Sequence, residues 1–97
     1  MTHAKIYVPK SLNEDLHIDV KKTLSDLFGG FTMYFTHGGW VNSSGELVEE
    51  KVLVYETYTD IIYSDVKKDM DSLAGYVMDM SDEDTVMYTV NHDSFFK

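Results

Sequence analysis

Carboxylates are the most numerous chemically active groups in this sequence. It holds 17 Asp and Glu against 8 Lys and Arg, for a formal net charge of −9. Because a nucleic-acid reader normally presents a basic stripe, we expect no direct nucleic-acid binding. Carboxylates spaced along one edge could instead imitate phosphates and engage a basic protein partner, or they could simply solvate a helix face. The acids that predict this partner-binding edge are Asp65, Asp69, Asp71, Asp82, Glu83 and Asp84.

Aromatic side chains form the second candidate binding surface. Tyr7, Tyr34, Tyr55 and Tyr88 lie in strand-like segments, and we expect them on a sheet face that no helix covers. Such a patch suits a protein partner, because tyrosine buries area while its hydroxyl stays wet. Trp40 is expected at a hairpin tip as an interface anchor. The alternatives are that the tyrosines reflect strand propensity alone and that Trp40 folds back over the sheet end.

Metal ligation and catalysis find little support in the residue pattern. The chain has no cysteine, and no two histidines have His-x-x-x-His spacing. We therefore predict no metal, no cofactor and solvent-facing histidines. No P-loop, dinucleotide fingerprint or nucleophile elbow is present, so no catalytic residue is assigned. Enzyme activity stays open, and His37, Tyr34 and Tyr55 would then be the first residues to mutate. The four histidines are His3, His17, His37 and His92.

A long β-hairpin is the element most able to position these groups. Residues 31–37 and 48–58 are rich in β-branched and aromatic side chains, and turn-forming residues 42–45 lie between them. Gly38 and Gly39 predict a bulge or a sharp bend before Trp40. Two further strands are expected at residues 4–8, ended by Pro9, and at residues 85–91.

Two amphipathic helices complete the predicted domain. Ser11 and Glu14 fit a capping box at the start of the first helix, and Gly29 suits its end. Asp60 or Ser64 could cap the second helix, whose apolar stripe runs from residue 62 to residue 77. The order β-α-β-β-α-β predicts an α+β, ferredoxin-like fold, in which a four-stranded antiparallel sheet carries both helices on one face. Residues 1–97 form this single domain, and the tail from residue 92 tucks against the body.

The expected compartment follows from what the sequence lacks. Without cysteine there are no disulfides, which favours a reducing compartment. No window approaches the length of a membrane span, and the first residues have no apolar signal core. We therefore predict a cytoplasmic protein without a membrane partner.

The hairpin resembles that of a family of small, uncharacterised bacterial and phage proteins, a domain of unknown function. The resemblance rests on Leu-Phe-Gly-Gly-Phe-Thr at residues 27–32, on Gly38-Gly39-Trp40, on Gly45 and on Val-Glu at residues 48–49. Members of the family pair a Gly-aromatic-Thr strand start with a hairpin of the Gly-x-x-Trp type. The resemblance covers about residues 24–90 and implies the ferredoxin-like fold but no particular chemistry.

Size, charge and aromatic content together predict a small acidic interaction protein without enzymatic activity. A phage-encoded inhibitor of the anti-CRISPR or anti-defence type, docking on a basic nucleic-acid-binding target, would have these properties. The alternative is a homodimeric α+β barrel that pairs through the open sheet face and binds or transforms a small molecule.

Overall fold

Strand β1 (Thr2–Pro9) lies at the centre of the sheet in this computed structural model, which describes residues 1–97. Its side chains alternate strictly between the two faces of the sheet. Ala4, Ile6 and Val8 are fully buried under the helices, while the residues between them face the other side and stay partly exposed. β1 therefore provides one continuous apolar ridge on which both helices pack.

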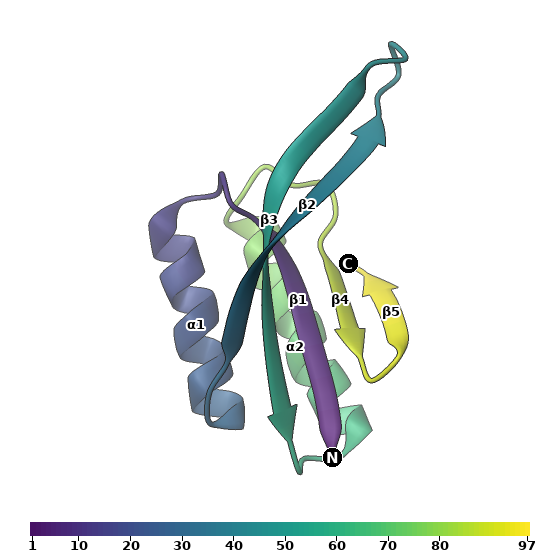
Figure 1. The fold of residues 1–97 in the computed structure, drawn as a ribbon. Helices are drawn as coiled ribbons and strands as arrows, with labels where there is room; N and C mark the ends of the chain where they lie inside the picture. The colour runs from purple at the N-terminus through teal and green to yellow at the C-terminus, as the bar shows by residue number, and fades with distance from the viewer.

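The sheet has five antiparallel strands in the order β2-β3-β1-β4-β5, and both helices lie on one side of it (Figure 1). This confirms the α+β class, but the predicted count of four strands is wrong. The tail pairs with β4 because Asn91 adopts a φ of 56°, a left-handed conformation that asparagine tolerates, and so reverses the chain. The other elements are α1 (Glu14–Phe28), β2 (Thr32–Val41), β3 (Leu47–Thr59), α2 (Tyr63–Asp79), β4 (Met87–Val90) and β5 (Asp93–Phe96).

Both helix starts differ from the predicted ones, whereas the end of α1 agrees with the prediction. Asn13, not Ser11, caps α1, because its side-chain oxygen accepts from the Asp15 amide at 2.7 Å. Gly29 ends α1 with a φ of 90°, as predicted. α2 begins after Ile62 with no side-chain cap, so neither predicted cap is used, and it ends at Asp79.

The β2–β3 hairpin projects beyond the body of the domain (Figure 1), which contributes to extents of 44 × 27 × 23 Å. Its ladder runs unbroken from Thr32↔Glu56 to Val41↔Leu47, so the bulge predicted at Gly38 and Gly39 is absent. The Asn42 side chain accepts from two amides of the turn, and Gly45 adopts a φ of 78° there. None of the helices is long and apolar enough to cross a membrane.

His17 lies in the core, contrary to the prediction that all four histidines face solvent. Only 2% of it is exposed, because α1 turns this residue toward the sheet. Its Nε2 lies 3.1 Å from the Pro9 carbonyl oxygen and its Nδ1 lies 2.7 Å from the Tyr55 hydroxyl. Since a carbonyl can only accept, Nε2 donates in the neutral ring and Nδ1 accepts the Tyr55 proton.

We expect His17→Ala to lower the free energy of unfolding by about 2–4 kcal/mol, because it leaves a cavity and two buried polar groups without partners. Tyr55→Phe should cost about 1 kcal/mol, since it removes one hydrogen bond and keeps the ring. Urea unfolding followed by circular dichroism measures both. His92→Ala, on an exposed residue, is the control and should stay within about 0.5 kcal/mol. Equal values for the two histidine variants would contradict this role of His17.

Candidate functional site

The open face of the sheet carries only two of the four predicted tyrosines. Tyr7 and Tyr34 both stand opposite Val54 in the strand register, on the side away from the helices. Tyr55 and Tyr88 belong to the core and are 0% and 1% exposed, so their predicted exposure is wrong. The apolar run around Tyr55 could have faced either side, and its pairing with Ile6 places it under the helices.

The predicted acidic edge is divided between two places. Asp65, Asp69 and Asp71 lie on α2, in the helix layer. Asp71 accepts from the Tyr88 hydroxyl and from Lys97 Nζ, each at 2.7 Å, and these bonds hold the pKa of its carboxyl below the ordinary value. Asp71 therefore links α2 to β4 and to the C-terminal Lys97 rather than offering a free charge to a partner.

A hollow of about 480 Å³ on the open face brings five of the predicted residues together, whereas Tyr34, Asp65 and Asp69 do not line it. All five strands and the loop between α2 and β4 contribute to this sheet-face hollow. Tyr7, Trp40, Asp82, Glu83 and Asp84 were predicted as binding residues, and all of them line it. The lining residues that the sequence pattern did not reveal include Glu50, Met87 and Phe96.

The sequence did not predict Glu50, Met87 and Phe96 as site residues, for different reasons. Glu50 lies in a strand whose predicted role was structural, and the strand register alone places it on the open face beside Trp40. Met87 and Phe96 stand directly opposite each other in the β4–β5 ladder. Because β5 was not expected, nothing in the sequence placed Phe96 on the sheet.

Glu83 is the most strongly perturbed carboxyl in the sheet-face hollow. Burial raises its pKa, and the negative charges of Glu50, Asp84 and Asp82 raise it further. None of these four carboxylates forms an ion pair within the chain. The hollow therefore has a negative potential that a bound cation would relieve.

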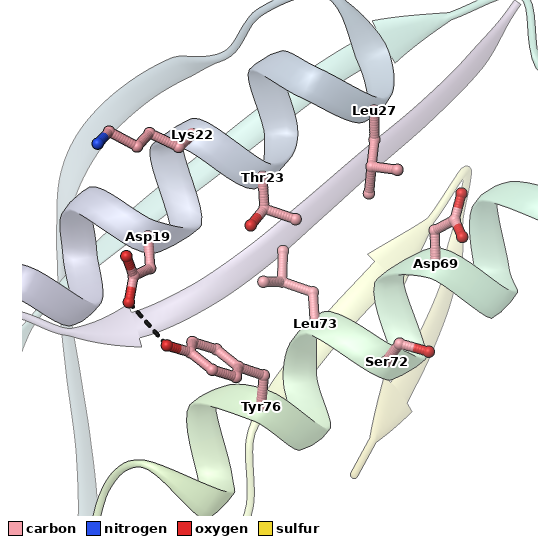
Figure 2. A pocket seen from close by; sticks show the side chains of 8 residues that line it. All are labelled: Asp19, Lys22, Thr23, Leu27, Asp69, Ser72, Leu73 and Tyr76. Carbon is pink, nitrogen blue, oxygen red and sulfur yellow. Dashed lines mark hydrogen bonds between the residues drawn. The ribbon is translucent and has the colours of Figure 1, made fainter.

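A second hollow, of about 410 Å³, lies between the two helices. Figure 2 shows Tyr76 of α2 reaching across to Asp19 of α1, with Leu27 and Leu73 between the helices. The Tyr76 hydroxyl donates to the Asp19 carboxylate at 2.7 Å, so these two polar groups already satisfy each other. This interhelical hollow has one aromatic ring and fewer unpaired charges, so it suits a charged ligand less well than the sheet-face hollow.

His37, which the sequence analysis considered for an enzyme, lies away from the sheet-face hollow. His37 Nε2 contacts Glu49 Oε1 at 3.1 Å on the exposed hairpin, and strand alternation places both on the opposite side from Glu50. No cluster of three or more His, Asp or Glu side chains is placed to hold a metal ion.

Comparison with known proteins identifies a fold neighbour. No family model and no curated protein sequence matches the chain. A solved structure of a phage SAM lyase in complex with S-methyl-5′-thioadenosine is similar, with a TM-score of 0.78, over 99% of this chain and 88% of the other. The apo form of a phage SAM lyase gives a TM-score of 0.76, over 99% and 87%. Identity is 14% in both cases, so the likeness is one of fold.

This likeness corrects the functional prediction. The chain shares its fold with an enzyme, which runs against the predicted non-enzymatic inhibitor of the anti-CRISPR type. Size, charge and the lack of a catalytic motif led to that prediction, and none of these features reveals the fold that the chain shares with an enzyme. The resemblance to a family of unknown function stays a prediction, as does the basic protein partner.

We expect Glu83→Gln to stabilise the chain at neutral pH by less than about 1 kcal/mol. The folded chain holds the Glu83 proton more tightly than the unfolded chain does, so stability falls as the pH rises from the ordinary value of 4.5 through the raised pKa. The glutamine side chain of the Glu83→Gln variant does not ionise, so this variant avoids that loss of stability. Urea unfolding at several pH values should therefore show a gain at neutral pH that vanishes below the ordinary pKa.

Glu46→Gln, in the exposed hairpin turn, serves as the matched control and should show no such dependence on pH. A Glu83→Gln variant that is less stable than the parent at neutral pH would contradict the crowding of negative charge in the sheet-face hollow.

Proposed function

We propose that this chain is a small enzyme that binds S-adenosylmethionine and cleaves it to S-methyl-5′-thioadenosine. The observation that carries the proposal is the likeness to a phage SAM lyase over 99% of the chain, at a TM-score of 0.78. The lining of the sheet-face hollow supports it independently, because aromatic rings and unpaired carboxylates suit an organic cation.

S-Adenosylmethionine presents groups that match this lining. Its sulfonium is a cation without hydrogen-bond donors, and aromatic faces such as those of Trp40 and Phe96 attract such a charge by roughly 0.5–2 kcal/mol. Its α-ammonium needs acceptors, which Glu50 and the loop acids can supply. A volume of about 480 Å³ lies within the ordinary range for small-molecule sites.

The proposed cleavage breaks the bond between the sulfonium sulfur and the γ-carbon of the methionine part. The electron pair stays on sulfur, which becomes the neutral thioether of S-methyl-5′-thioadenosine. The substrate's own carboxylate forms the new bond to that carbon, so homoserine lactone is the second product and no water, proton or cofactor enters. Opposite charges cancel along this path, so a site that excludes water favours it. The α-ammonium keeps its charge throughout, and the protein's carboxylates can hold the substrate by it.

The strand order and the origin of the matched structures support two further proposals, on the type of fold and on the source of this chain. We also propose that the first four strands and the two helices form a ferredoxin-like unit with β5 as an addition, and the order β2-β3-β1-β4 supports this. The phage origin of both matched lyases supports a phage origin for this chain.

We expect the purified chain to convert S-adenosylmethionine to S-methyl-5′-thioadenosine, measured by liquid chromatography with mass detection. Glu50→Gln and Trp40→Ala should each lower kcat/KM about tenfold or more, the equivalent of about 1.4 kcal/mol of transition-state stabilisation. Both side chains are partly exposed, so the variants should fold, which circular dichroism checks.

Asp69→Asn, in the interhelical hollow, is the control and should retain parental activity. Failure of the parent chain both to bind S-adenosylmethionine and to release the thioether would refute the proposed function. Loss of activity in Asp69→Asn alone would instead indicate that the active site is the interhelical hollow.

A further inference from the structure

Strand β2 is an edge strand without any of the usual protection. It forms one end of the sheet and continues along the projecting hairpin (Figure 1). Its ten residues include no Asp, Glu, Lys, Arg or Pro, although the whole chain is rich in charge. Exposed edges in natural proteins normally carry charges, prolines or bulges that prevent pairing with another chain. β2 has none of these, and its ladder to β3 contains no bulge.

Large apolar side chains on β2 are also uncovered. Phe35 is 61% exposed within the strand, and Val41 is 64% exposed at its end. Met33 and Trp40 are exposed as well. An uncharged edge that also exposes large apolar side chains indicates a surface that another strand covers.

We propose that a second copy of this chain covers β2, through antiparallel pairing of β2 with β2 about a twofold axis. The two five-stranded sheets then become one continuous sheet. This inference does not rest on the proposed function. It also differs from pairing through the open sheet face, because the contact lies along the strand edge and leaves the sheet-face hollow on each copy accessible.

Electrostatics favours this edge over the rest of the surface. Two copies that each carry −9 repel, so contact requires a region from which the acids are distant. On the neighbouring strand β3, Glu49 and Glu50 lie one strand away from this edge. With both β2 strands between them, the two β3 strands are about 14 Å apart, beyond the screening length of about 8 Å at physiological salt. The other edge, β5, has four residues and includes Asp93, so it offers a shorter and charged ladder.

The area available sets the expected strength of pairing. A ten-residue strand is about 33 Å long, and the sheet with its side chains is about 10 Å deep. Covering such a strip with its overhanging side chains buries on the order of 500 Å² per copy, near the lower limit of specific interfaces. We therefore expect a reversible dimer with a dissociation constant of about 1–100 μM.

Sedimentation velocity of the full chain over a concentration series tests the pairing. The weight-average mass should rise from 11.1 kDa toward twice that value as concentration increases. Phe35→Lys should raise the dissociation constant at least about tenfold, because it introduces a pair of like charges at the edge. Met80→Lys is the matched control, since Met80 is also 61% exposed but lies at the end of α2, and it should leave the constant unchanged.

A mass of 11.1 kDa at every concentration, or a closed trimer, would overturn the proposal. Equal effects of the two lysine variants would do the same, and so would dissociation by Tyr7→Lys without any effect of Phe35→Lys, which would indicate pairing through the open face.

Spin labels then locate the contact. Because the chain has no cysteine, Thr36→Cys and Ser94→Cys each provide a single labelling site, in β2 and in β5. In a β2–β2 dimer, two labels at residue 36 should lie within about 20 Å of each other, since half the strand is about 17 Å long. Labels at residue 94 should lie much farther apart, with four strands of each copy between them. The reverse order of distances would overturn the proposed pairing.

Discussion

Burial of β1 between β3 and β4 is the constraint on which the rest of this structure depends. Both edges of β1 are hydrogen-bonded, and its apolar face is sealed by the two helices. The position of β1 fixes the register of β3, and β3 in turn fixes β2. A slip of one residue would turn Ile6 and Val8 outward and bring Lys5 and Tyr7 under the helices, at a cost of several kcal/mol. The open face therefore owes its composition to the packing on the opposite face.

The register also explains which site residues were predictable from the sequence. Tyr7 and Tyr34 alternate with apolar neighbours, so their face could be derived from the period of two. Tyr55 and Tyr88 lie in strands that are apolar on both faces, where the pattern does not distinguish the sides. Their positions follow only from pairing with β1, which is a tertiary property. The loop acids were recognised as a group, but the sequence could not show that Glu50 of a distant strand lies among them.

The sequence predicts which segments form helices and strands better than it predicts the residues at which they begin and end. The amphipathic stripe of α2 predicts the helix, yet its first turn has no side-chain cap that would mark where it begins. β5 was missed because it is four residues long and depends on an asparagine in a left-handed turn. The function was misjudged because fold likeness at 14% identity leaves no trace in short motifs.

The sheet-face hollow is lined on one side by the projecting hairpin and on the other by strands that lie over the core. The hairpin side is held by fewer contacts. Trp40 and Glu50 stand on the arm beyond the backbone hydrogen bond from Lys10 to Lys51, where β2 and β3 pair only with each other, whereas Tyr7 and Met87 stand over the core. Hydrogen exchange in such an arm is governed by local opening, well below the free energy of global unfolding. A ligand that touches both sides must immobilise the arm, and its affinity is reduced by the entropy of doing so. Anything that stiffens the arm from outside would thereby tighten binding without contacting the ligand.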